Sequence, residues 1–430
     1  MKKLLMLNAS MYEIPLIYAA KELGFYVITT GNNSSAPGHK AADEYAPFDY
    51  SDYDGMVNLA QKIGIDAISQ GCSDNCALVA AYMGEKLGLK GHDTFENAQI
   101  IHRKDYFKRF VKDNEIKSPV AECFEDVNQA LNYDTQDKYP LIIKPSDQAG
   151  GKGVSRVDTR DEYEQAIKKA FGKSNIGHVV IEPFLQGTLH SFCSFIVNEK
   201  VAAYSTWNDY SFKNGFLTNS GLCPADDWKE AVSFLIPQVE KIAKKLGLVD
   251  GLLHLQYMKC GHEYWIIEMM RRMPGNNSTT AAAYSTGVNW NHWIIKAEAG
   301  QSCCGIPSFE TMDRYYGYHS IMSDGNGIFE GVSIKEEFKK YIIDIEMYDD
   351  KGAEINDYLY QKFGLVQFYL NSKEEKDKYM GEIMKYNDIV ITYLSDISSH
   401  TARLEAIEKA IESIKLGIDT LNTKGIILKR

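Results

Sequence analysis

Apolar and polar positions follow two alternating periods along the first hundred residues. Short apolar runs with the length of buried strands are LLML (4–7), FYVITT (25–30) and DAIS (66–69). Between the first two runs, apolar residues recur every three to four positions, which is the helix period: Leu16, Ala19, Ala20 and Leu23. Further helices are indicated around residues 56–63 and before Gly88. Strands that alternate with helices predict a parallel, doubly wound α/β unit over residues 1–97.

The next two hundred residues predict an α+β domain. A basic helix starts near His102, and a capping box at Thr159 and Glu162 opens another helix within a small lobe of about residues 118–187. A long amphipathic helix with Pro237 inside it follows at 228–246. The run LLHLQYMKCGHEYWIIEMM then reads as two strands joined by a Gly-His turn. We place this domain at residues 98–304.

The pattern changes again after residue 305. Strand-like runs are YIIDIEMY, VQFYL and DIVITYL, and a last helix carries Leu404, Ile407, Ile411 and Ile414 on one face. These elements predict a separate C-terminal α+β domain over residues 305–430.

Composition narrows the class of partner. The chain has 430 residues, 44% of them hydrophobic, and a formal net charge of −11 without a long basic run, so nothing indicates a nucleic-acid or membrane binder. Its eight cysteines lack zinc-ligand spacing, and its short apolar start ends at Asn8, before the length of a signal-peptide core. No run reaches the length of a membrane span. We therefore expect a cytoplasmic protein with reduced cysteines and small-molecule partners.

The segment IIKPSDQAGGKGV (142–154) carries the first chemical signal. Its spacing is neither that of a Walker A loop nor that of a dinucleotide fingerprint, and the loop NASMYE (8–13) also lacks dinucleotide glycines, so we assign no nicotinamide cofactor. Strand-like residues resume directly after Gly153, which predicts a flexible hairpin. Bare glycines bring backbone N–H groups close to phosphates and let a loop close over them. The alternative interpretation is an exposed hairpin whose lysines are solvated.

Two further segments carry polar groups at strand ends. In IEPFLQG (181–187), Glu182 is suited to the polar groups of an adenosine between apolar walls, although a surface glutamate is the commoner reading. Gln256 and Glu268 offer oxygen ligands of the kind that magnesium prefers, and Arg272 suits a phosphate or an oxyanion. An ordinary ion pair between Glu268 and an arginine remains the alternative.

In this order, the segments resemble the ATP-grasp superfamily, specifically the carboxylate-amine ligase branch with biotin carboxylase, the carbamoyl-phosphate synthetase large chain and the L-amino acid ligases. The likeness covers about residues 1–300. Lys104 stands where that family opens its K-x-x-x-K helix, Lys144 matches its strand lysine, and AGGKGV resembles its glycine lid. Glu182 and Leu185 match its adenine hinge. The nucleotide-binding residues that the resemblance implies are Lys104, Lys144, Gly150, Gly151, Lys152, Gly153, Glu182, Pro183, Phe184, Leu185 and His190.

On the metal side, Gln256 and Glu268 fall where the family places two metal acids, and Arg272 matches the arginine of its E-x-N-x-R signature. The resemblance implies ATP and Mg²⁺ (or Mn²⁺), two lobes that grip the nucleotide, and phosphorylation of a carboxylate to an acyl phosphate that an amine attacks. Glu268 and Arg272 are then the catalytic residues. The chain departs from the family at Gln256, which replaces an acid, and at Met270, which replaces an asparagine and is a poor magnesium ligand. We expect one firmly held metal and a second held chiefly by nucleotide.

Three functions stay open from the sequence. The first is an ATP-dependent ligase that joins a carboxylate to an amine, with amino-acid substrates and with Asn276 and Asn277 near the substrate carboxylate. The second activates bicarbonate, for which the segment WNDYSFKNG offers only Asp209 and Lys213. The third is a nucleotide-binding sensor that has lost turnover. The resemblance also implies a homodimer.

Overall fold

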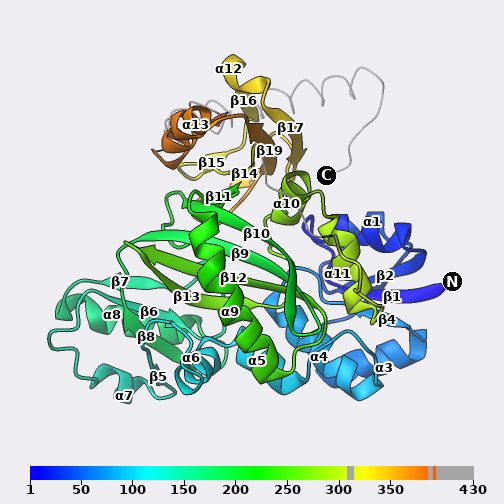
Figure 1. Cartoon of the computed structure of the whole chain (residues 1–430), viewed down its shortest axis with the longest axis horizontal. Coiled ribbons are helices and arrows are strands. Elements are labelled where there is room, and N and C mark those ends of the chain that lie inside the picture. Colours follow the sequence, from blue (N-terminus) through cyan, green and yellow to red (C-terminus); the bar gives the residue numbers. More distant parts are fainter. Residues whose placement is uncertain (308–313, 386–390, 394–430) are drawn as a thin grey trace, which may run out of the picture.

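A computed structural model describes residues 1–307, 314–385 and 391–393 of the protein (Figure 1). Figure 1 shows a central sheet with the N-terminal unit at one end and a small lobe at the other, and the C-terminal strands above it. Within the described residues, no helix is long and apolar enough to cross a membrane. The predicted last helix at 404–414 lies outside the described residues, as does all of DIVITYL except Ile391–Tyr393.

The N-terminal unit is the predicted parallel α/β structure. Its sheet has the strand order β3-β2-β1-β4, and all three pairings are parallel. The strands are β1 (Lys2–Leu7), β2 (Phe25–Gly31), β3 (Glu44–Pro47) and β4 (Ala67–Ser69), and the helices are α1 (Ile14–Glu22), α2 (Gly38–Ala41), α3 (Tyr53–Ile63), α4 (Asp74–Leu87) and α5 (Phe95–His102). Gly64 and Gly88 end α3 and α4 with φ of 71° and 66°, a conformation that glycine adopts without strain.

The small lobe is a four-stranded sheet with the order β5-β8-β6-β7. Its elements are α6 (Lys104–Asp113), β5 (Glu122–Phe124), α7 (Val127–Leu131), β6 (Leu141–Pro145), β7 (Ser155–Val157), α8 (Arg160–Lys173) and β8 (Val179–Pro183). The predicted capping box opens α8, and the backbone N–H of Thr159 donates to the Glu162 carboxylate at 3.3 Å. Apolar side chains of α8 pack against the sheet through fully buried Ile167 and Ala170.

The large sheet has eight strands in the order β13-β12-β9-β10-β11-β14-β19-β17. Its first part contains β9 (Thr188–Val197), β10 (Lys200–Ser211), β11 (Thr218–Cys223), α9 (Trp228–Leu246), β12 (Gly251–Cys260), β13 (Glu263–Met270), α10 (Ser278–Thr286) and α11 (Trp290–Glu298). The β12–β13 hairpin turns at Gly261 and His262, as predicted. Leu235, Val239 and Ile242 on one face of α9 are fully buried, each stabilising the fold by about 1.5–3 kcal/mol.

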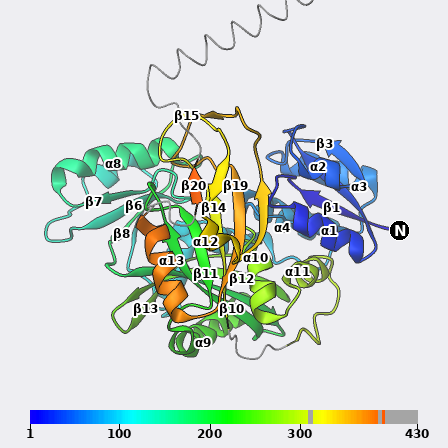
Figure 2. The same cartoon turned by 90° about the horizontal axis from the view of Figure 1, so that it is seen from above.

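The C-terminal strands continue the large sheet. β14 pairs antiparallel with β11, so the hydrogen bonding runs unbroken across the predicted boundary at residue 305. The elements are β14 (Tyr315–Ile321), β15 (Gly327–Ile328), β16 (Val332–Ile334), α12 (Glu336–Lys339), β17 (Ile342–Met347), β18 (Glu354–Ile355), β19 (Gly364–Leu370), α13 (Lys373–Lys385) and β20 (Ile391–Tyr393). Seen from above, these strands lie between the small lobe and the N-terminal unit (Figure 2).

Candidate functional site

A row of polar side chains crosses the large sheet. The strand register places Gln256 on β12 opposite Glu268 on β13 and, on its other side, opposite Ser191 on β9. The Ser191 hydroxyl donates to Asp209 on β10, which the Gln256 side chain also contacts by a hydrogen bond. Burial raises the pKa of Asp209 to about 7, against the effect of these two hydrogen bonds. Because Glu268, Gln256 and Ser191 are in register and Asp209 lies diagonally beyond them, this face of the sheet is suited to a polar ligand.

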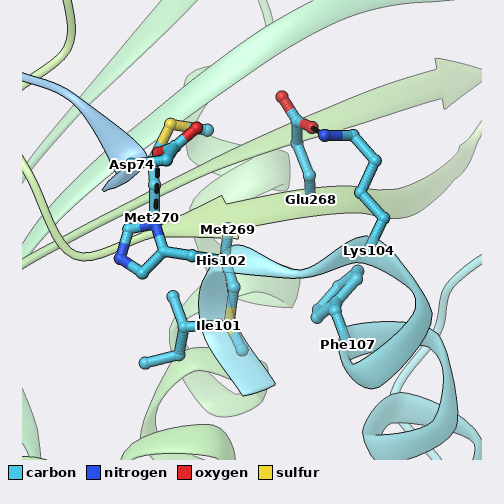
Figure 3. Close-up of a pocket in the computed structure, with 8 residues that line it drawn as sticks. All are labelled: Asp74, Ile101, His102, Lys104, Phe107, Glu268, Met269 and Met270. Atoms are coloured by element: carbon cyan, nitrogen blue, oxygen red, sulfur yellow. Dashed lines mark hydrogen bonds and ion pairs between the residues drawn. The ribbon is translucent and has the colours of Figure 1, made fainter. Parts of the chain in front are cut away.

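Lys104 joins that row to the small lobe. Its ammonium donates to the Gln148 carbonyl oxygen at 2.7 Å and lies 3.3 Å from the Glu268 carboxylate. Figure 3 shows the Lys104 and Glu268 side chains pointing toward each other. The pair lines a small pocket together with Asp74, Ile101, His102, Phe107, Met269 and Met270. Lys104 and Glu268, which the sequence predicted for phosphate and metal, are therefore brought together from separate elements.

The strand lysine and the predicted hinge acid form a buried ionic cluster. The Lys144 ammonium donates to one Glu182 oxygen, and the Lys108 ammonium lies 2.6 Å from the other. The side chains of all three residues are at most 5% exposed. Burial lowers the pKa of Lys108 to about 8, although Glu182 acts in the opposite direction. The Glu182 side chain is thus committed to two cations, and its backbone pairs with Ile142 on β6.

Sequence reasoning missed Lys108. Two signals were available. Lys108 is the second lysine of the K-x-x-x-K pattern that Lys104 opens, and it lies in α6 between Phe107 and Val111, which are 1% and 3% exposed. A lysine on the buried side of an amphipathic helix requires an anionic partner. Glu182 is that partner, 74 positions away in sequence.

The glycine segment is a hairpin loop, as predicted. β6 and β7 pair antiparallel, and the loop between them carries Gly150, Gly151 and Gly153 with φ between 64° and 76°. Lys152 is exposed. The Tyr360 hydroxyl, which comes from the C-terminal part of the chain, donates to the Gly151 carbonyl oxygen at 3.4 Å. The loop therefore lies over the junction of the small lobe and the large sheet.

The hinge segment leaves β8 after Pro183. The Phe184 backbone N–H donates to the Pro140 carbonyl oxygen at 2.9 Å, and the Arg156 guanidinium lies 4.2 Å from the centre of the Phe184 ring. Leu185 is half-buried. These contacts fix where the chain crosses from the small lobe into β9.

His190 lies at the start of β9 in a buried position. One ring nitrogen faces the Trp207 carbonyl oxygen at 3.2 Å and the other faces the Thr188 hydroxyl at 2.7 Å. The carbonyl accepts only, so Nδ1 carries the hydrogen and Nε2 accepts from Thr188. Burial lowers the pKa of His190, which favours this neutral ring. The ring stacks on Tyr257 with centroids 5.1 Å apart.

Arg272 is anchored by the N-terminal unit. Its Nε donates to the Asp74 carboxylate at 2.8 Å, and His102 contacts the same oxygen at 3.1 Å. Although burial acts in the opposite direction, the Arg272 charge holds the pKa of Asp74 far below its usual range. Sequence reasoning missed Asp74, which opens α4 of the N-terminal unit and gave no local signal of an arginine 198 positions away.

The two predicted substrate asparagines lie between the large sheet and the C-terminal strands. The Asn276 amide donates to the Tyr318 hydroxyl. Asn277 precedes α10 with a φ of 52°, and its amide nitrogen is 3.5 Å from the Glu346 carboxylate. Neither asparagine contacts the Lys104–Glu268 pair, so the structure separates them from the phosphate side of the site.

The row fits one magnesium ion. The Glu268 side chain forms an ion pair with Lys104 alone among the described residues, which leaves carboxylate oxygen for a metal. The Gln256 amide nitrogen donates to Asp209, which directs its carbonyl oxygen as the available ligand. A second group, Asp105, Glu125 and His178, brings its donor atoms within 4.8 Å of one another. Its members already pair with Ser146, Arg109 and each other, which accounts for their positions without an ion.

Comparisons with known proteins show which families and folds this chain is similar to. Residues 102–215 match the family model described as phosphoribosylglycinamide synthetase, ATP-grasp (A) domain. A phosphoribosylamine–glycine ligase from Yersinia pestis is 32% identical over 168 residues, which are 37% of this chain and 39% of the relative. The chain therefore spans about two fifths of the length of that relative.

Two solved structures show the same fold over most of the chain. The L-amino acid ligase from Bacillus licheniformis has a TM-score of 0.79 at 19% identity, covering 92% of this chain and 99% of its own. The biotin carboxylase domain of the 2-oxoglutarate carboxylase from Hydrogenobacter thermophilus, in complex with MgADP and bicarbonate, has a TM-score of 0.73 at 20% identity, covering 92% and 90%. These matches confirm the predicted ATP-grasp fold and the resemblance on which it was based.

Proposed function

We propose that this chain, which has an ATP-grasp fold, is an ATP-dependent carboxylate-amine ligase with amino-acid substrates that releases ADP and phosphate. The observation that carries the proposal is the position of Lys104, whose ammonium reaches both the loop before the glycine lid and Glu268 on the opposite lobe. A triphosphate between the lobes would meet this cation, the lid N–H groups and the acid at one place. The Hydrogenobacter domain, which has the same fold, is in complex with MgADP, and this supports a magnesium nucleotide as the ligand.

The chain's own residues divide the chemistry between them. Lys104 and Lys144 neutralise phosphate charge, and the lid covers the γ-phosphate and excludes water. Glu268 and Gln256 would hold magnesium, which would supply further positive charge to the phosphates. A carboxylate oxygen of the substrate attacks the γ-phosphorus while the bond to ADP breaks, which yields an acyl phosphate. The amine nitrogen then attacks the acyl carbon, phosphate leaves, and the nitrogen loses a proton.

Arg272 stabilises the negative charge that develops on the acyl oxygen when the amine attacks. Its guanidinium is always protonated, and Asp74 and the Met273 carbonyl oxygen fix its orientation. A fixed cation beside the acyl oxygen stabilises the tetrahedral intermediate without reorganisation during the reaction.

The test is an assay of phosphate release with ATP, magnesium and pooled amino acids, repeated with bicarbonate alone. Hydroxylamine is added in parallel because it captures an acyl phosphate as a stable hydroxamate. Hydroxamate and amino-acid-dependent phosphate release support the ligase. Phosphate release that requires only bicarbonate supports the carboxylating alternative and contradicts the ligase.

A nucleotide-binding sensor is the second candidate function, because Gln256 and Met270 weaken the metal side. Its signature is tight ATP binding without phosphate release under any of these conditions. The Lys104–Glu268 contact would then serve to close the lobes on ATP.

Gln256→Glu separates the ligase from the sensor. In a ligase, the added charge is expected to tighten magnesium binding a few-fold with little change in turnover, whereas in a sensor it starts ATP hydrolysis. The new carboxylate also faces buried Asp209 without a cation, which raises the pKa values of both groups. A folded state that holds protons more tightly loses stability as pH rises, so the variant should lose more thermal stability than the unchanged protein between pH 6 and pH 8. Magnesium titrations and thermal unfolding at both pH values measure these effects.

Gly151→Ala is expected to weaken ATP binding more than Gly150→Ala. Both residues have positive φ, so both substitutions carry a backbone strain of about 1–2 kcal/mol. A Cβ at 151 would also lie 2.7 Å from the Phe216 carbonyl oxygen, whereas one at 150 meets only Leu217 at 3.6 Å. We expect the dissociation constant of a non-hydrolysable ATP analogue to rise about tenfold further in the first variant. Equal effects in calorimetric titrations would show that the lid does not close against Phe216.

A further inference from the structure

A second polar cluster lies where the N-terminal unit meets the C-terminal strands. It consists of Tyr12 from the loop after β1, Asn277 before α10, and Glu346 and Tyr348 at the end of β17. We call it the junction cluster. Figure 1 shows α10 below β17 and beside the N-terminal unit. The rings of Tyr12 and Tyr348 meet edge to face with centroids 5.8 Å apart, and the Asn277 amide reaches Glu346.

The junction cluster contains buried polar atoms without partners. The Tyr348 hydroxyl and the Asn277 carbonyl oxygen are both buried, and neither has a hydrogen-bond partner among the described residues. Asn277 is only 1% exposed. A buried polar atom left unpaired lowers stability by about 1–3 kcal/mol. Two such atoms in one cluster indicate groups that a ligand completes.

Glu346 supplies an uncompensated charge at the same place. It forms no ion pair within the described part of the chain, and its one hydrogen bond is from Asn277. Burial raises the pKa of Glu346, and the negative charge of Asp344 adds to that effect. A half-buried carboxylate within electrostatic reach of Tyr12 and Tyr348, next to acceptor oxygens, has the chemistry that recognises an alkylammonium group.

Contacts connect the junction cluster to the proposed reaction centre. The Cys72 thiol donates to the Tyr12 carbonyl oxygen at 3.3 Å. Burial raises the pKa of that thiol, and the nearby Arg272 charge acts in the opposite direction. Asn277 is five residues from Arg272 along a segment whose Asn276 binds Tyr318. The cluster is therefore placed to hold one part of a substrate whose carboxyl or amine group reacts beside Arg272.

We propose that Glu346, Asn277, Tyr12 and Tyr348 form a subsite for the primary ammonium group of an amino-acid substrate. The proposal rests on the proposed ligase function for the identity of that substrate. Glu346 pairs with the ammonium, the Asn277 and Tyr348 oxygens accept its remaining hydrogens, and the two rings cover it. Two sources have this chemistry: the amino acid whose carboxylate is activated, and the amine that attacks it.

The binding test uses L-amino-acid amides, which carry the ammonium group but no carboxylate, with the matching N-acetyl amides as uncharged counterparts. The full chain is screened with a non-hydrolysable ATP analogue and magnesium, and the tightest amide is titrated by calorimetry. Glu346→Gln should weaken its binding at least about tenfold, as expected for a lost hydrogen bond to a charged group. Asp344→Asn removes a charge from the same strand outside the cluster and should change binding less than about twofold.

Tyr348→Phe is a second variant that changes no charge, so it tests the subsite even if Glu346→Gln does not fold. It removes the unpartnered hydroxyl, so thermal stability should stay equal or rise, while amide binding weakens a few-fold. The proposal is overturned if no amide binds the unchanged protein, if N-acetyl amides bind equally well, or if Glu346→Gln binds as tightly as Asp344→Asn. These binding results hold whether or not the protein has ligase activity, which the phosphate and hydroxamate assays decide separately.

Turnover assays distinguish the two sources of the ammonium group. Hydroxamate formation requires only the activated carboxylate substrate, because hydroxylamine replaces the amine. If Glu346→Gln raises the KM of the amino acid in that assay, the subsite holds the activated amino acid. If hydroxamate formation is unchanged and only the KM of the second amino acid rises, the subsite holds the attacking amine. Unchanged KM values in both assays overturn the assignment.

Discussion

Replacing Glu182 by alanine is expected to destabilise the small lobe by about 3–5 kcal/mol, since it leaves the ammonium groups of Lys108 and Lys144 buried without an anion. ATP binding should be lost with it, because Lys144 would no longer be held in place at the end of β6. Thermal unfolding and calorimetric titration with an ATP analogue measure the two effects. Glu122→Ala removes an exposed carboxylate from the neighbouring strand β5 and should change neither.

The pH dependence of the Glu182→Ala protein provides a further check. Glu182 raises the pKa of Lys108, which burial has already lowered to about 8. Without the carboxylate, the folded-state pKa falls further, whereas the unfolded chain keeps the ordinary lysine value. The unfolded state then binds more protons, so the variant should gain stability as pH rises from 7 toward 10. A stability that is independent of pH, or equal to that of Glu122→Ala, would show that the two lysines are solvated.

Glu268→Gln is expected to lower ATP-dependent phosphate release roughly a hundredfold or more. The amide keeps the shape of the side chain but removes the charge that balances Lys104 and binds magnesium. The magnesium concentration for half-maximal rate should therefore rise. Folding should be preserved, because the Glu268 side chain is 27% exposed and its ion pair is replaceable by water.

Glu263→Gln is the matched control for this substitution. Glu263 begins the same strand, is more exposed, and pairs with Lys117 away from the pocket. Its loss should leave both the rate and the magnesium dependence unchanged. A Glu268→Gln protein with full activity at low magnesium would exclude Glu268 as a metal ligand.

Much of the fold follows from local patterns in the sequence. The parallel N-terminal unit has strongly periodic segments with glycine terminators such as Gly64 and Gly88, and the lid hairpin has glycines that permit positive φ. Long-range pairings gave no such signal. The β11–β14 pairing joins residues about a hundred positions apart, so the continuation of the large sheet past residue 305 was not visible in any one segment.

The candidate site shows the same division. Lys104, Lys144 and Glu268 stand at the ends of recognisable elements, and the resemblance to the ATP-grasp superfamily implied a common role for them. The ion-pair partners of two other predicted residues came from distant parts of the chain: Lys108 pairs with Glu182, and Asp74 pairs with Arg272. The sequence connected Asp209 only with bicarbonate. Its hydrogen-bond neighbours Ser191 and Gln256 are distant in sequence and are brought to it by the strand order, which no single segment shows.

The unbroken β11–β14 pairing bears on how substrates enter. Glu268 and Glu346 lie at opposite ends of one hydrogen-bonded sheet, whereas the small lobe and its lid share no strand with it. Opening the lid to exchange ADP for ATP therefore leaves the spacing between those two carboxylates unaltered. We expect nucleotide and amino acid to bind independently, so that the order of addition is random and a bound amino acid stays in place while ADP is exchanged for ATP.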